Sequence, residues 1–403
     1  IAWALSEEPF FKSLNWKDVD LIKLRASYGQ TGTENGVNRF GYMPVYDMDK
    51  NIIVIGGELQ SGFSEGKLVS PSLLSWYTRN SLNYGIDMAF LGNRLKSTAD
   101  YFFYVTKGGL MSPGDRYTTP LGKDLPQIKS NSEQRREGVE FSLRWNDKAG
   151  KNFTYDLGFN MTYFNNLWKV KADESMADLM NPWKRTTNQT DFYDVRLISQ
   201  GYYQTVEQIL NSPRRPQASE LKFGDIAYQD INGDGKIDDQ DQKRVGNASM
   251  PHFTYGFDFS FGYKGFSLSG LLYGTGKRNM EVAGQFRGVR PTYKQQLDYW
   301  TEENRDATFP RLTTATSRNG DNNVQKSDFW LKNASFLRLK NLQLSYDLKY
   351  SVLKNIDWLN TFRVNLSGAN LFTISGISKF YDPETPNINN EGGFYATDGS
   401  AYP

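Results

Sequence analysis

The chain has 403 residues, a net charge of +2, no cysteine and one histidine, His252. Without cysteine, disulfide frameworks, thiol catalysis and Cys/His zinc sites are excluded, and a near-neutral charge gives no electrostatic case for nucleic-acid binding. A Ser/His/Asp triad would have to use His252, which stands beside Pro251 at the start of a predicted strand. We therefore expect a protein that is not an enzyme.

Ten segments alternate apolar and polar residues with a period of two, which is typical of β-strands with two different faces. The clearest runs from Phe253 to Tyr263, where six aromatic residues share one face and Thr, Gly, Asp and Ser residues share the other. In another segment the phase changes between Leu339 and Leu342, which predicts a β-bulge at Lys340-Asn341. In chain order, the strands are predicted near residues 1–5, 19–29, 80–91, 94–106, 136–146, 152–164, 252–263, 265–276, 332–347 and 360–372.

The connections between these strands alternate between short and long. Short turns are predicted at Gly92-Asn93, at 147–151 and at Lys264-Gly265, where Gly or Asn supplies positive φ. The long connections are predicted at 30–79, 107–135, 165–251, 277–331 and 373–403. Loops of this length argue against a compact soluble domain, whereas outer-membrane barrels combine short periplasmic turns with long external loops.

Charged residues recur at mid-strand on the face opposite the aromatic one. A soluble multi-domain β-protein, which is the alternative, would bury one face in a packed core, whereas a water-filled barrel interior accepts charges. No run of 18 apolar residues is present, so no transmembrane helix is expected. We therefore predict an all-β, membrane-spanning, antiparallel up-and-down β-barrel with lipid on its aromatic side. The charged residues are Arg144, Asp156, Asp258 and Arg363.

Residues 230–241, with the sequence DINGDGKIDDQD, have the spacing of a calcium-binding loop. Such a loop places oxygen ligands at positions 1, 3, 5, 7, 9 and 12, and a glycine, here Gly235, at position 6. Ile237 at position 8 would anchor the loop, and flanks that are not helical favour a structural staple over a sensor. The alternative is an Asp/Asn/Gly-rich turn that fits by chance. The predicted Ca²⁺ ligands are the side chains of Asp230, Asn232, Asp234, Asp238 and Asp241 and the carbonyl of Lys236.

Seven stretches resemble a known family. They are LRASYGQTG at 24–32, LNYGIDMAFLGNRL at 82–95, GDIAYQDINGDGKIDDQD at 224–241, FTYGFDFSFGYKGFSLS at 253–269, WLKNASFLRLKNLQLSYDL at 330–348, LSGANLFT at 366–373 and YDPE at 381–384. In this order and spacing they resemble the C-terminal half of the barrel in the SusC/RagA family, which are TonB-linked outer-membrane transporters of Bacteroidota.

The resemblance implies a 22-stranded TonB-dependent receptor barrel, of which residues 1–403 would supply about ten strands. The plug domain, the first half of the barrel and the last strand would lie outside this chain. It also implies TonB-energised uptake of an oligosaccharide or peptide through the cell outer membrane. The implied partners are a SusD/RagB-like surface lipoprotein, the TonB–ExbB–ExbD complex and outer-membrane lipid.

Two other functions stay open from the sequence. One is a structural or docking barrel that holds surface partners without transport, and the other is a secreted, calcium-stabilised β-protein that binds carbohydrate. Aromatic residues of the long connections are candidate substrate contacts, because aromatic rings stack on sugars; their alternative role is packing within the connections. These residues are Tyr202, Tyr203, Phe286 and Tyr293.

Overall fold

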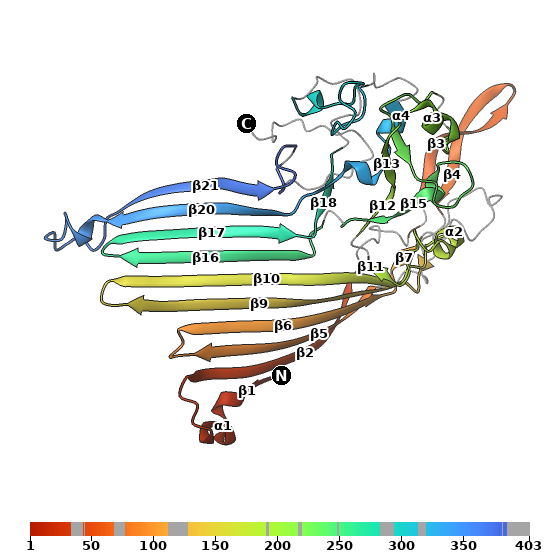
Figure 1. Cartoon of the computed structure of the whole chain (residues 1–403). Helices are drawn as coiled ribbons and strands as arrows, with labels where there is room; N and C mark the ends of the chain where they lie inside the picture. The colour runs from red at the N-terminus through yellow and green to blue at the C-terminus, as the bar shows by residue number, and fades with distance from the viewer. Residues whose placement is uncertain are drawn as a thin grey trace.

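The computed structural model describes residues 1–33, 43, 45–67, 77–111, 128–190, 193–216, 220–247, 250–282, 294–312, 320–380 and 382–384. Its main feature is one antiparallel sheet in which ten strands are hydrogen-bonded in sequence order, with the short β11 paired to β10 beside them (Figure 1). All ten predicted strands are present, and each pairs with the next. They are β1 (Ala2–Ala4), β2 (Val19–Thr33), β5 (Tyr77–Phe90), β6 (Leu95–Lys107), β9 (Glu133–Ala149), β10 (Phe153–Val170), β16 (Phe253–Tyr263), β17 (Phe266–Gly276), β20 (Phe336–Asp347) and β21 (Arg363–Ser375).

The pairing register places like residues on like faces. Phe159 of β10 lies opposite Phe257 of β16 and Leu143 of β9, and the ring centroids of Phe153 and Phe261 are 6.2 Å apart. We call this side the aromatic face. Because a strand alternates its side chains, the intervening residues form the opposite face, which is mainly polar and which we call the polar face.

Charges on the polar face are paired across neighbouring strands. Arg25 of β2 donates from Nε to Asp87 of β5 at 3.0 Å and from Nη2 to Asp100 of β6 at 2.9 Å. Arg144 of β9 contacts Asp156 of β10 at 2.5 Å. Since the opposite face is aromatic, the sheet has the two surfaces of a membrane barrel wall, one for lipid and one for water.

The predicted bulge is confirmed in β20. Leu271 pairs with Asn341 and Leu272 with Leu339, so Lys340 is the extra residue in the ladder. One inserted residue reverses the alternation. Leu339 and Leu342 therefore both remain on the aromatic face although they differ in parity.

Two of the predicted hairpins have the expected backbone. Gly92 and Asn93 have φ of 68° and 64°, and Lys264 and Gly265 have φ of 45° and 86°. Positive φ at both central residues matches the right-handed twist of the flanking strands. The third turn is tighter than predicted, because β9 continues to Ala149 and the reversal is made at Gly150, whose φ is 65°.

Hairpins and long connections lie at opposite ends of the sheet (Figure 1). The three hairpins are at one end, which we call the turn end, and the described parts of the long connections are at the other, the loop end. Two connections of intermediate length also lie at the turn end. One holds the short helices η1 (Leu5–Glu7) and α1 (Pro9–Ser13), and the other begins with η9 (Leu348–Tyr350).

The long connections contain structure that the sequence did not reveal, and most of its elements have only two to six residues, too few to show a period. The first holds a hairpin of β3 (Val45–Ile55) and β4 (Glu58–Lys67). Among the residues described, no helix is long and apolar enough to cross a membrane. The other elements are β7 (Leu110–Met111), β8 (Ile128–Lys129), α2 (Met176–Met180), β11 (Gln189–Thr190), β12 (Asp194–Leu197), β13 (Ser199–Tyr202), α3 (Val206–Asn211), β14 (Ile226–Tyr228), η5 (Asp239–Asp241), β15 (Gln242–Val245), β18 (Asn279–Glu281), η7 (Lys294–Leu297), α4 (Gly320–Asn323), η8 (Asp328–Trp330) and β19 (Leu331–Asn333).

Candidate functional site

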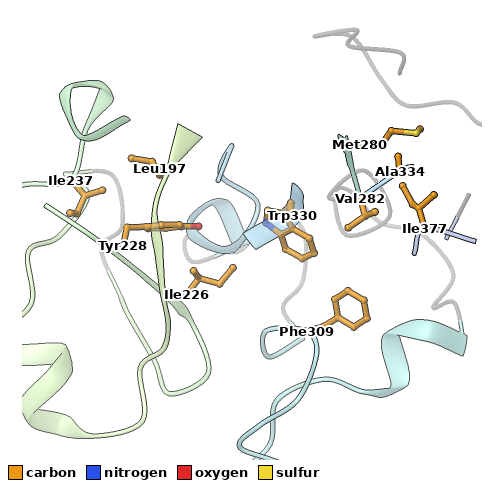
Figure 2. Close-up of a cluster of buried hydrophobic side chains, with 10 residues drawn as sticks. All are labelled: Leu197, Ile226, Tyr228, Ile237, Met280, Val282, Phe309, Trp330, Ala334 and Ile377. Atoms are coloured by element: carbon orange, nitrogen blue, oxygen red, sulfur yellow. The ribbon is translucent and has the colours of Figure 1, made fainter. Parts of the chain in front are cut away.

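The described parts of connections 165–251 and 277–331 fold together with the segment that follows β21. We call this unit the loop assembly. Its core is a cluster of side chains that are each at most 4% exposed, with Trp330 between two groups of buried side chains (Figure 2). None of the core residues belongs to the ten strands of the sheet. They are Leu197, Ile226, Tyr228, Ile237, Met280, Val282, Phe309, Trp330, Ala334 and Ile377.

Trp330 is the largest fully buried side chain of this core. Its indole N–H donates to the carbonyl of Asn323 at 2.8 Å, and its ring lies 4.9 Å from Phe329 and 6.3 Å from Phe309. The N–H of a buried tryptophan usually has a hydrogen-bond partner. Trp330 therefore ties the segment before β19 to α4 as well as filling the core.

A buried carboxylate, that of Asp225, joins three segments of the loop assembly. It accepts hydrogen bonds from Arg311 Nε at 2.6 Å, from Asn323 Nδ2 at 2.8 Å and from the backbone N–H of Lys222 at 2.8 Å. The preceding Gly224 has a φ of 81°, and a Cβ there would lie 2.4 Å from the ring of Trp300. Glycine and aspartate in the GDIAYQD stretch thus have structural roles, which sequence reasoning missed.

A second buried ion pair links β12 to β18. Arg196 is fully buried and contacts Asp194 at 2.5 Å and Glu281 at 2.9 Å, while Lys326 contacts Asp194 at 2.9 Å. Burial raises the pKa of the Asp194 carboxyl, but the charges of Arg196 and Lys326 outweigh this and hold that pKa below its ordinary value.

The 230–241 loop is held by its own carboxylates. Asp230 accepts the backbone N–H of Gly233 at 2.6 Å and of Gly235 at 2.8 Å, and Asp241 accepts that of Ile231 at 2.8 Å. Desolvation raises the pKa of Asp230, but the hydrogen bonds from these glycine N–H groups lower it by more, so the net shift of the pKa is downward. Ile237 is buried in the core, as the spacing predicted.

The predicted calcium ligands are only partly brought together. Asn232, Asp234 and Asp238 are exposed and accept backbone N–H groups of the loop, whereas Asp241 is fully buried. Over the described ranges, no group of three or more His, Asp or Glu side chains is placed to hold a metal ion. A carboxylate oxygen that accepts one N–H keeps a lone pair for a cation, so the donor set fits Ca²⁺ chemically, and the ion stays a prediction.

Two of the four candidate aromatic contacts have packing roles. The hydroxyl of Tyr202 donates to the carbonyl of Ala307 at 3.1 Å, and its ring is 5.8 Å from Phe329. Tyr203 is 3% exposed. Phe286 and Tyr293 lie outside the described residues. Packing, the alternative role given above, therefore applies to both tyrosines that the structure describes.

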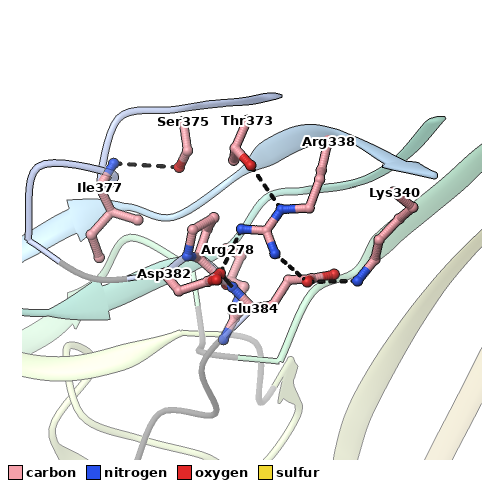
Figure 3. A network of polar contacts seen from close by, with 9 residues as sticks. Arg278, Arg338, Lys340, Thr373, Ser375, Ile377, Asp382 and Glu384 are labelled. Carbon is pink, nitrogen blue, oxygen red and sulfur yellow. Dashed lines mark hydrogen bonds and ion pairs between the residues drawn. The ribbon is translucent and has the colours of Figure 1, made fainter. Parts of the chain in front are cut away.

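The segment after β21 is fastened to the polar face of the sheet (Figure 3). Arg338 of β20, with 1% of its side chain exposed, contacts Asp382 at 2.6 Å and Glu384 at 2.5 Å, and Lys340 contacts Glu384 at 2.6 Å. Arg278 donates to the carbonyl of Pro383. The acidic residues of the YDPE stretch thus bind the segment to the barrel wall, which sequence reasoning did not predict.

We compared the sequence of the chain with those of known proteins. No family model matches the chain. A TonB-dependent receptor of Formosa agariphila is 25% identical over 435 residues, which cover 97% of this chain and 40% of that receptor. The TonB-dependent receptor SusC of Bacteroides thetaiotaomicron is 26% identical over 87% of this chain and 34% of its own length. The chain is therefore similar to TonB-dependent receptors of the SusC/RagA type.

Among solved structures, the chain is similar to the RagAB peptide importer in its open-open state, with a TM-score of 0.72 and 20% identity over 96% of this chain and 40% of that chain. A second RagAB structure gives a TM-score of 0.69. The family resemblance, the barrel fold and the outer-membrane location predicted from the sequence are confirmed. The chain spans about two fifths of the length of the first curated relatives that it matches.

Proposed function

We propose that the full-length protein imports a nutrient across the outer membrane, and that residues 1–403 supply part of its barrel wall and its outer loops. The observation that carries this proposal is the ten-strand antiparallel wall with all its described long connections at one end, in a chain 25% and 26% identical to TonB-dependent receptors. RagAB, which the chain resembles in fold, is a peptide importer, and the family resemblance adds oligosaccharides. The proposed cargo is therefore a peptide or an oligosaccharide.

The proposed partners act at the two ends of the wall. A SusD/RagB-like surface lipoprotein would cap the loop end, and the TonB–ExbB–ExbD complex would act on parts of the protein outside this chain. Exposed apolar side chains on the loop assembly support a lipoprotein seat, since such residues form the centres of protein interfaces. Met176 is 71%, Met180 75% and Trp183 52% exposed.

Energy-dependent uptake tests the proposal against a docking barrel. Cells that make the full-length protein and its lipoprotein are given a fluorescently labelled peptide digest or labelled oligosaccharides, with and without collapse of the inner-membrane proton gradient. An importer accumulates label inside the cell and loses that accumulation, but not surface binding, when the gradient collapses. Surface binding without gradient-dependent accumulation, or accumulation equal to that of a strain lacking the gene, would favour the docking barrel.

We also propose that the 230–241 loop binds a structural Ca²⁺. Its support is the match of ligand spacing to known calcium loops and the burial of Ile237, which holds the loop on the core. Asp234→Ala should lower calcium content and speed hydrogen exchange in the loop, while exchange in β16 and β17 stays unchanged. Asp239→Ala, at a position that supplies no ligand, is the matched control. Equal exchange in this loop with calcium and with chelator would rule the ion out.

A further inference from the structure

The connection between β1 and β2 differs from the hairpins that share the turn end. It spans residues 5–18, includes η1 and α1, and exposes large apolar side chains where the hairpins have Gly, Asn and Lys. Phe10 is 55%, Leu14 52% and Trp16 57% exposed. Three such residues within seven positions form an exposed apolar patch on this connection.

Contacts with β1 show on which side of the sheet this patch lies. Trp3 pairs with Leu24, and Leu24 pairs with Ile86, a member of the aromatic face. The indole N–H of Trp3 donates to Glu8 Oε1 at 2.8 Å, and its ring is 6.4 Å from that of Phe10. The connection therefore packs on the aromatic side of the wall.

The patch has a defined shape. Phe11 is 8% exposed and meets the ring of Trp16 edge-on at 5.4 Å, and Lys12 pairs with Glu7 at 2.7 Å. Phe10 and Leu14 are four positions apart, which places them on one side of a helical turn. Phe11 thus holds the segment together while Phe10 and Leu14 point outward.

We propose that residues 5–18 form an in-plane membrane anchor, with Phe10, Leu14 and Trp16 inserted among the lipid head groups at the turn end. Because the surface lipoprotein is proposed to cap the loop end, the turn end would lie at the periplasmic leaflet, and this inference rests on that proposed function. The patch is continuous with the aromatic face, which meets lipid. Tryptophan favours this zone because its ring is apolar and its N–H is polar.

The charges of residues 5–18 argue against recognition of anionic lipid. Three acidic residues stand against two basic ones, so the net charge is −1, and attraction to anionic lipid would not drive insertion. Burial of apolar surface at the head-group boundary would do so in a bilayer of zwitterionic lipid. The charged residues are Glu7, Glu8, Lys12, Lys17 and Asp18.

Spin-label accessibility tests the anchor directly. A nitroxide is attached at Leu14→Cys or Phe10→Cys in a cysteine-free form of the full-length protein in phosphatidylcholine bilayers. Collisions with oxygen, which concentrates in lipid, are compared with collisions with a water-soluble nickel complex. Phe257→Cys on β16 is the reference for lipid, and Leu210→Cys on α3, which is 66% exposed at the loop end, is the matched control.

We expect the ratio of oxygen to nickel accessibility at Leu14 and Phe10 to exceed that at Leu210 several-fold, and to be the same with anionic lipid present. High nickel accessibility would place the segment in water and overturn the proposal. Low accessibility to both reagents would mean that protein covers the patch, which also overturns it. Either failure, with Phe257 still in lipid, would leave the proposed import function intact.

Discussion

The sheet and the loop assembly are stabilised in different ways. The side chains of Phe257 and Phe259 on the aromatic face remain partly exposed, since no second layer of the described residues covers them. In the loop assembly, Ile226, Val282 and Trp330 are all 0% exposed. The sheet depends on its backbone ladder and on lipid, whereas the loop assembly has the dry core of a small soluble domain. Damage to one region should therefore leave the other folded.

The largest expected effect is in the core of the loop assembly. Trp330→Ala should destabilise that unit by about 3–5 kcal/mol, because it removes a fully buried ring and leaves a cavity. Hydrogen exchange in the full-length protein should speed up in β12 and β14 and stay slow in β10 and β16. Trp358→Ala, at a side chain that is 83% exposed, should change stability by no more than about 0.5 kcal/mol. Equal loss of protection in the sheet would show that the two regions are one cooperative unit.

The buried Asp225–Arg311 pair should give a comparable effect with a diagnostic rescue. Arg311→Met leaves a fully buried carboxylate without its cation, at a cost of about 3–5 kcal/mol. Adding Asp225→Leu to Arg311→Met should recover part of the loss, because the unpaired charge is then gone. A double variant less stable to denaturant than Arg311→Met would argue against the pair as the cause.

In the sheet, the test is the environment of each face. Phe257→Arg should cost about 2–4 kcal/mol if the residue lies near the bilayer midplane, measured as folding into lipid vesicles. Ser260→Arg, on the polar face of the same strand, should cost much less. Gly256→Arg is a poorer control, because a Cβ there would come within 3.0 Å of Asn160. Equal costs at Phe257 and Ser260 would contradict the assignment of faces.

The smallest expected effect is a dependence on pH in the loop assembly. The pKa of Asp194 lies below its ordinary value of 3.8 in the folded state. Its stabilising effect is therefore full above that pH and is lost as the pH falls through the lower, folded value. Asp194→Asn should remove this acid sensitivity from β12 exchange rates, while those of β16 stay unchanged. An unaltered pH profile would assign the sensitivity to another group.

The sequence predicted the sheet well and the loop assembly poorly, for physical reasons. Strands such as Phe253–Tyr263 are long enough for a period of two to show, and the bulge at Lys340 is visible as a change of phase. In contrast, Asp225 and Arg311 are 86 residues apart, and Arg338 and Glu384 are 46 apart. Only the folded chain brings such partners together, and no local pattern marks them.

The calcium-like loop shows another limit of sequence reasoning. Its spacing identified Ile237 as an anchor and Gly235 as the glycine of a sharp turn; in the structure Ile237 is buried and Gly235 has a positive φ. The spacing did not reveal that Asp230 and Asp241 accept backbone N–H groups of the loop. The same carboxylates can shape a turn and bind a cation, so the pattern alone does not distinguish these roles.

The proposed orientation of the sheet in the membrane can be tested directly, by labelling one cysteine at each end of the sheet. Met180→Cys, at a residue 75% exposed at the loop end, and Lys151→Cys, at an exposed hairpin position, are made singly in a cysteine-free full-length protein. Intact cells lacking the surface lipoprotein are treated with a membrane-impermeant maleimide. We expect labelling at Met180→Cys, and at Lys151→Cys only after the cells are opened. Labelling of Lys151→Cys but not Met180→Cys on intact cells would contradict the proposed orientation, and with it the outer loops and the lipoprotein seat.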